Sequence, residues 1–161
     1  MFNRGDKVFY EQTGVCVVED VSEKALMKNP KKLYYTLRPL YQQNNIIYAP
    51  VDSDKVFIRE IISKTEAQRL IKTVPEVYKK DFYKETEEDY QSALESHSCD
   101  DLLDLAVKIY VKKQEIKKAK KKLGFIDEKY LHRAEELLFG ELATALEIST
   151  EEVPNLLFGA L

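Results

Sequence analysis

The spacing of apolar residues along the chain changes near residue 63. Before this point, short β-branched and aromatic runs are separated by turn residues, which is typical of strands in a small antiparallel barrel. After an opening strand that carries Val8 and Tyr10, with Gly14 at the following bend, the predicted strands are Val15–Val18, Leu33–Leu37, Ile46–Tyr48 and Val56–Ile58. Asn44-Asn45 is expected to form a hairpin turn, because Asn tolerates a positive φ.

Beyond residue 63 the apolar positions recur with a helical period. Ser63 and Glu66 are placed as an N-terminal capping box, and Pro75 is expected to end this first helix. A second helix is expected over roughly residues 87–97. The remaining boundary residues are Asp100 or Asp101 as the cap of a third helix, Gly124 as its stop, Asp127 as the start of a fourth, and Ser149-x-x-Glu152 as the cap of a short last helix.

These two patterns predict an α+β fold with two domains. Residues 1–62 are expected to form a Tudor/SH3-like antiparallel β-barrel, and residues 63–161 a compact all-α helical domain. Barrels of this kind usually bind other macromolecules and seldom catalyse reactions, so the barrel points to a binding module.

Composition narrows the class of protein. The chain has 161 residues, and no apolar run approaches the roughly 18 residues that span a bilayer. Its N-terminus lacks a basic segment followed by an apolar core, so we expect a cytoplasmic protein without a membrane partner. Cys16 and Cys99 are expected to be two separate thiols.

Charge is distributed unevenly under a net charge of −3. Residues 85–104 contain eight acidic residues and no Lys or Arg, whereas residues 108–122 contain eight Lys against Glu115 alone. An acidic total argues against a purely electrostatic DNA-binding protein, although one basic surface could still contact phosphates.

Few residues are arranged in the sequence so that they could catalyse a reaction or bind a metal. His97-Ser98-Cys99-Asp100 brings four such side chains together in sequence, but a nucleophile needs its base within hydrogen-bond reach, and the run reads as an interhelical turn. A site made of His97 and Cys99 would leave tetrahedral zinc two ligands short. We therefore expect no enzymatic activity, no metal, no cofactor and no small-molecule substrate.

The N-terminal motifs, taken in order, resemble the CarD/CdnL family of bacterial RNA polymerase-binding transcription regulators. The residues that carry the resemblance are Phe2-x-x-Gly5-Asp6-x-Val8-x-Tyr10-x-x-x-Gly14-Val15, Tyr34-Tyr35-x-Leu37, Ile46-Ile47-Tyr48-Ala49-Pro50 and Val56-Phe57-Ile58-Arg59-Glu60-Ile61-Ile62. A looser match follows at residues 134–143. Transcription-repair coupling factors carry the same module before a motor, but this chain has no Walker phosphate loop.

The resemblance implies that the first domain docks on the β subunit of RNA polymerase by adding to a sheet edge. Strand addition needs free backbone N–H and C=O groups, and flanking side chains supply selectivity. By position, Lys24, Leu26 and Tyr48 fall where the family makes this contact. The alternative is that Lys24 is a solvated loop residue and Tyr48 a surface cross-strand aromatic.

The sequence departs from the family where many members carry a DNA-inserting Trp beside basic residues. This chain has no Trp; that position aligns near Thr86 and is followed by Glu87, Glu88 and Asp89. Tyr83 or Tyr90 could replace the ring, although core packing is favoured for both. The lysine run offers another contact, with Lys117, Lys118, Lys120 and Lys121 as the candidate DNA-binding residues, against the alternative of a solvated helix face.

The function expected from the resemblance is a transcription regulator that docks on the polymerase β subunit and places its helical domain near the upstream edge of promoter DNA. The alternative is a protein–protein adaptor that uses the same barrel without DNA contact. The acidic residues after Thr86 favour the adaptor, and the lysine run favours the regulator.

Overall fold

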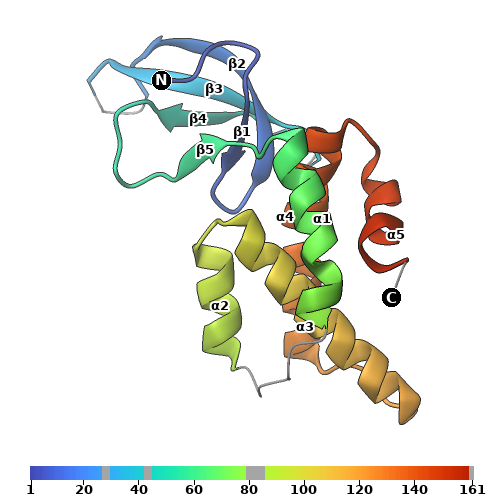
Figure 1. Cartoon of the computed structure of the whole chain (residues 1–161). Coiled ribbons are helices and arrows are strands. Elements are labelled where there is room, and N and C mark those ends of the chain that lie inside the picture. Colours follow the sequence, from blue (N-terminus) through green and yellow to red (C-terminus); the bar gives the residue numbers. More distant parts are fainter. Residues whose placement is uncertain (27–29, 42–44, 79–85, 160–161) are drawn as a thin grey trace. The chain divides into compact units, whose positions relative to one another are not determined.

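A computed structural model describes residues 1–26, 30–41, 45–78 and 86–159 of the chain. The chain divides into two compact units, Met1–Ile61 and Ile62–Leu161. Within the described residues, the first unit holds five strands and the second holds five α-helices and one short 3-10 helix (Figure 1). The predicted α+β class is confirmed.

The five strands form one antiparallel sheet. They are β1 (Lys7–Tyr10), β2 (Gly14–Lys24), β3 (Lys32–Pro39), β4 (Ile47–Pro50) and β5 (Ile58–Glu60), in the spatial order β4-β3-β2-β1-β5. Gly14 adopts a φ of 87°, which makes the tight bend between β1 and β2 possible, as its position predicted. Asn44 of the predicted hairpin turn lies outside the described residues.

The five described strands form an open sheet, so the predicted antiparallel barrel is not closed. Closure would require β4 and β5, the two outer strands, to pair with each other. The strand predicted at 56–58 lies at 58–60 instead, because the backbone of Phe57 is occupied by the turn after β1. Its carbonyl accepts from the Glu11 N–H at 3.1 Å, and its N–H donates to Glu11 Oε1 at 3.2 Å.

One face of the sheet holds the core of the first unit. Its fully buried members are Val8, Cys16, Val18, Tyr35, Leu37 and Ala49. Phe2 packs against this cluster, and its N–H donates to the Tyr35 hydroxyl at 3.0 Å, so the N-terminal segment is fixed to the sheet.

A β-bulge interrupts β2. Val18 lies opposite Leu37 and Asp20 lies opposite Thr36, so Glu19 is an extra residue on β2 without a counterpart on β3. Such a bulge reverses the orientation of every residue that follows it.

In the second unit, α1 (Lys64–Tyr78), α2 (Glu87–Glu95), α3 (Cys99–Lys118) and α4 (Phe125–Leu146) pack together with η1 (Thr150–Glu152) and α5 (Val153–Phe158). Apolar residues at helical spacing in α3 and α4 are buried, among them Leu102, Leu105 and Ile109 of α3 and Tyr130, Leu137 and Leu142 of α4, whereas Ile116 and Ala145 are half-buried. The Glu66 N–H donates to Ser63 Oγ at 3.1 Å, which confirms the Ser63 cap, while the Glu66 carboxylate accepts from Arg69. The predicted Ser149–Glu152 capping box is present and caps η1.

Three predicted helix boundaries are wrong. Pro75 does not end α1, which continues to Tyr78 with the proline at an exposed position inside the helix. Ser98, rather than Asp100 or Asp101, caps α3 by accepting from the Asp101 N–H. Gly124 caps the N-terminus of α4, which begins at Phe125 instead of Asp127.

Helix α3 ends at Lys118 because its last carbonyls are satisfied there by a Schellman motif. The Lys120 N–H donates to the Lys117 carbonyl at 2.9 Å, and the Lys121 N–H donates to the Ile116 carbonyl at 3.0 Å. Lys120 takes the left-handed conformation, with a φ of 57°, that is usually left to Gly. The stop therefore comes six residues before Gly124.

The buried acid of α4 has a structural partner. Glu141 is fully buried, and its Oε2 accepts from the Ile62 N–H at 3.0 Å, which satisfies a backbone donor at the entrance to α1. No helix in the described part of the chain is long and apolar enough to cross a membrane.

Burial of Cys16 predicts that the first unit loses stability in alkali. Burial raises the thiol pKa to about 12, and burial followed by the charge of Glu11 also raises the pKa of Tyr10. Because an unfolded thiol titrates near pH 8.5, unfolding releases a proton between about pH 9 and 12. The free energy of unfolding should be level at neutral pH and fall across this interval, as measured by urea titration followed by circular dichroism.

Cys16→Ala supplies the control for this prediction. The variant should be less stable at neutral pH, because a buried side chain is shortened, yet its stability should fall less steeply from pH 9 to 10. An unchanged slope in the variant would show that Cys16 does not cause the alkaline instability.

Candidate functional site

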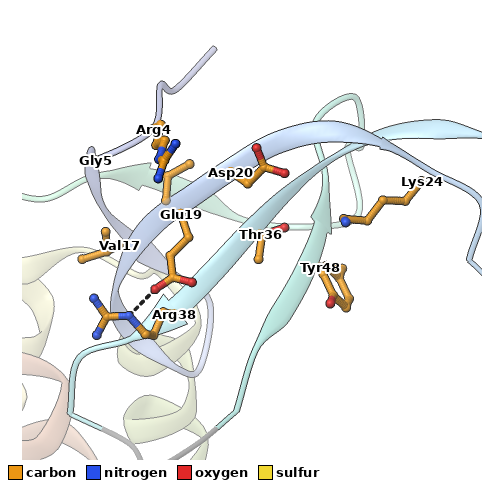
Figure 2. A pocket seen from close by; sticks show the side chains of 10 residues that line it. Arg4, Gly5, Val17, Glu19, Asp20, Lys24, Thr36, Arg38 and Tyr48 are labelled. Carbon is orange, nitrogen blue, oxygen red and sulfur yellow. Dashed lines mark hydrogen bonds and ion pairs between the residues drawn. The ribbon is translucent and has the colours of Figure 1, made fainter.

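A polar groove of about 560 Å³ lies on the sheet face opposite the core (Figure 2). Its lining residues are Arg4, Gly5, Val17, Val18, Glu19, Asp20, Lys24, Thr36, Arg38 and Tyr48. Strand register explains why these side chains meet. Asp20, Thr36 and Tyr48 lie opposite one another on β2, β3 and β4, so they share a face.

The groove brings together two of the three residues that the resemblance implicated in polymerase binding. Lys24 comes from the end of β2 and Tyr48 from β4, and the Lys24 Nζ atom lies 5.2 Å from the centroid of the Tyr48 ring. Figure 2 shows the lysine side chain extended towards the ring. The Tyr48 side chain is nevertheless 45% exposed, so a partner can reach it. A cation–π contact at such a site contributes about 0.5–1 kcal/mol.

Leu26, the third of these residues, follows β2 and is half-buried outside the groove lining. It lies two residues beyond Lys24, at the end of the same strand.

Charges of both signs line the rest of the groove. Glu19 and Arg38 form an ion pair, which Figure 2 draws, and Asp20 accepts from the Ser22 hydroxyl at 2.8 Å. Between them, Thr36 Oγ1 is buried without a hydrogen-bond partner among the described residues. The groove thus combines an aromatic ring, cations, carboxylates and an unused hydroxyl, which suits a polar peptide surface better than an apolar ligand.

Next to the groove, the second half of β2 is an open sheet edge. The Val51 N–H donates to the Leu33 carbonyl, so odd-numbered residues of β3 bond to β4 and even-numbered residues bond to β2. Asp20, Ser22 and Lys24 therefore direct their backbone groups towards β3, while Val21 and Glu23 direct theirs away from it. No described strand pairs with that side of β2 beyond Val18.

The two outer strands, β4 and β5, present fewer unpaired backbone groups than the second half of β2. By the same alternation, β4 presents the N–H and C=O of Tyr48 and then only the C=O of Pro50, since proline has no N–H. Strand β5 is three residues long.

In the second unit, the candidate DNA-binding lysines gather at the end of α3. Lys117 and Lys118 lie in its last turn and Lys120 and Lys121 in the following turn, and all four are exposed. Lys118 pairs with Glu115 at 3.3 Å. Earlier lysines of the run are matched by acids, since Lys108 pairs with Asp104 at 2.8 Å and Lys112 with Asp127.

The acidic residues after Thr86 open α2. Thr86 caps this helix in a capping box with Asp89, and hydrogen bonds from Thr86 lower the pKa of the Asp89 carboxyl. Glu87 and Glu88 share the first turn, where carboxylates favour the helix dipole. Tyr90 is buried and its hydroxyl donates to Asp127 at 2.7 Å, whereas Tyr83 lies outside the described residues.

The segment from His97 to Asp100 joins α2 to α3. His97 has a φ of 55°, Cys99 is buried as the first residue of α3, and Asp100 pairs with Arg69 at 3.1 Å. Cys16 and Cys99 are both buried and remain two separate thiols, as predicted. In the described ranges, no three residues of His, Cys, Asp or Glu are grouped so as to hold a metal ion.

Several residues of the groove and the surface were not predicted from the sequence. Thr36, Glu19 and Arg38 enter the groove only through the register and the bulge, which no local pattern specified. Phe125 and Ile126 are 83% and 45% exposed directly after the lysine cluster. A signal for Phe125 was present, because it is out of phase with the apolar positions that begin at Tyr130.

Comparison with known families identifies the first unit. Residues 2–62 match the model of the CarD-like/TRCF RID domain, which spans nearly all of the sheet-bearing unit and confirms the resemblance inferred from the strand motifs. The match fits a transcription-associated protein that interacts with RNA polymerase. Among curated proteins, none matches the chain.

Proposed function

We propose that the protein is a transcription regulator that docks on the β subunit of RNA polymerase through its N-terminal domain and places its helical unit near upstream promoter DNA. The observation that carries this proposal is the convergence of Lys24 and Tyr48 in one groove beside an open sheet edge. The CarD-like/TRCF RID match over the same unit supports the choice of partner.

Docking proceeds by strand addition to the second half of β2. The outward backbone groups of Val21 and Glu23 offer two N–H and two C=O groups to an incoming strand. The side chains of Lys24, Leu26 and Tyr48 lie at the end of this edge or in the adjoining groove, where they supply selectivity.

The proposed action is binding without catalysis, cofactor or metal. The groove lining contains neither His nor Cys, and its carboxylates are committed to Arg38 and Ser22. This arrangement supplies charge complementarity to a protein surface but no nucleophile held beside a base.

DNA contact is assigned to Lys117, Lys118, Lys120 and Lys121. All four are exposed, and the ion pair found for them within residues 86–159 is Lys118–Glu115, so they carry a local positive charge that phosphates would neutralise. A polymerase-bound factor needs only a modest intrinsic affinity for DNA, because tethering raises the effective concentration.

The adaptor without DNA contact remains the second candidate. It is favoured by Glu87, Glu88 and Asp89, which are all exposed at the start of α2 and would repel phosphate if that end faced DNA. Their role in starting the helix gives these carboxylates a structural reason that is independent of DNA.

Replacing one backbone donor tests strand addition directly. Glu23→Pro removes an N–H that points away from β3, so the sheet keeps its hydrogen bonds while the edge loses a donor. We expect binding to the isolated β-subunit lobe to weaken about tenfold by calorimetry. Glu23→Ala, which removes the side chain and its ion pair with Lys31 but keeps the N–H, should bind like wild type. Equal affinities of the two variants would reject this edge.

Side-chain selectivity has its own test. Tyr48→Ala and Lys24→Glu should each weaken binding to the lobe by about tenfold or more, because a central aromatic and its cation are removed. Lys55→Glu is the matched charge reversal, at an exposed position just before β5, the opposite outer strand. If Lys55→Glu weakened binding as much as Lys24→Glu, the effect would be general electrostatics and not recognition at the groove.

The DNA contact is tested on promoter complexes. Changing Lys117, Lys118, Lys120 and Lys121 together to Glu should shorten the lifetime of a polymerase–promoter complex while leaving binding to the β lobe unchanged. A lifetime equal to that with wild type would remove this contact and favour the adaptor.

A further inference from the structure

The turn between α3 and α4 combines charge with an exposed ring. Five lysines occupy six consecutive positions, as Lys117, Lys118, Lys120, Lys121 and Lys122, and all are exposed. Phe125 follows as the first residue of α4 with 83% of its surface exposed, and Ile126 beside it is 45% exposed. Phe125 and Met1 are the most exposed of the large apolar side chains described.

Phe125 is exposed on a segment whose backbone is anchored on both sides. The Schellman motif closes α3, and Leu123, which is 9% exposed, anchors the turn two residues before Phe125. Two residues after Phe125, Asp127 accepts from the Tyr90 hydroxyl and pairs with Lys112, so the start of α4 is tied to α2 and α3. The backbone that carries the ring is therefore anchored on both sides, three residues after Lys122.

Helical phase also keeps this ring out of the core. The buried positions of α4 include Tyr130, Leu131, Ala134 and Leu138. Phe125 lies on the other face, with the exposed residues Lys129 and His132. Its exposure follows from position, because rotating α4 to bury Phe125 would expose four core residues.

We propose that this turn binds single-stranded nucleic acid, with the lysines contacting phosphates and Phe125 stacking on an unpaired base. The inference rests on the proposed DNA contact and adds to it the state of the DNA that is preferred. A basic surface beside an exposed aromatic ring is how proteins hold single strands without reading sequence, since every base offers a π face. Bases inside a duplex are stacked on each other, so a ring can stack on them only after a base step has been unstacked at a cost in energy.

An anionic membrane is the competing class of partner. Lysines would attract its surface as well, but two exposed apolar side chains bury little area in lipid, and one single-chain anchor is already marginal. Nucleic acid uses both features of the turn, since phosphates pair with the lysines and a base pairs with the ring.

Fluorescence anisotropy with a labelled single-stranded oligonucleotide and its duplex distinguishes the contribution of the Phe125 ring to binding from that of the lysine charges. Phe125→Ala should weaken single-strand binding about 5- to 100-fold, leave duplex binding within about twofold, and keep the salt dependence. Lys117→Glu with Lys121→Glu should weaken both and reduce the salt slope for the single strand by about 1.4. If the lysine variant loses binding and Phe125→Ala does not, the stacking inference fails and the DNA contact stands. If wild type binds neither DNA at low salt, the proposed DNA contact fails as well.

Because the chain has no Trp, Phe125→Trp introduces a single reporter. Stacking should quench its fluorescence when the single strand is added, whereas Leu156→Trp, at a 46% exposed position of α5, should stay unchanged. A blue shift with phosphatidylserine vesicles and no response to the oligonucleotide would overturn the proposal in favour of a membrane. Equal quenching by the duplex would also overturn the preference for single strands.

Discussion

The bulge at Glu19 is the constraint on which the first unit depends. An uninterrupted β2 would place Asp20 on the core face and Val21 on the open face. The extra residue exchanges them, so Val21 joins the core while Glu19 and Asp20 both line the groove. The same exchange turns the backbone of Val21 and Glu23 away from β3. One inserted residue thus completes the core, the polar groove and the open edge together.

Much of this fold can be predicted from the sequence, because the local spacing of apolar residues indicates where the strands and helices lie. The bulge does not, since the run from Val15 to Val21 reads as a strand whether or not it carries an extra residue. The start of β5 differs from the prediction for a related reason: the Phe57 backbone bonds to Glu11, which is distant in sequence. Lys24 and Tyr48 were found only through family resemblance, and their contact needed the register of three strands.

The ends of the helices were also difficult to predict from the sequence, because several nearby residues can satisfy the backbone N–H and C=O groups that a helix end leaves unpaired. Gly124 looked like a stop, but Lys120 accepts the left-handed conformation and ends α3 earlier. Ion pairing likewise redistributes the charge blocks. Within the helical unit, Asp104 pairs with Lys108 and Asp100 with Arg69. A second concentration of exposed charge lies in the lysines from Lys117 to Lys122 at the α3–α4 turn.

Pro50, at the end of the outer strand β4, limits how far the sheet can be extended by strands of other molecules. A sheet that accepts strands at both outer edges can extend from molecule to molecule into a fibre. Here β5 spans only three residues, and β4 ends on a proline that offers a carbonyl without a donor. Both outer strands therefore offer few backbone groups for further pairing, and the accessible stretch of β2 has room for one short segment. The proposed strand addition would end after a single partner segment, which predicts a one-to-one complex.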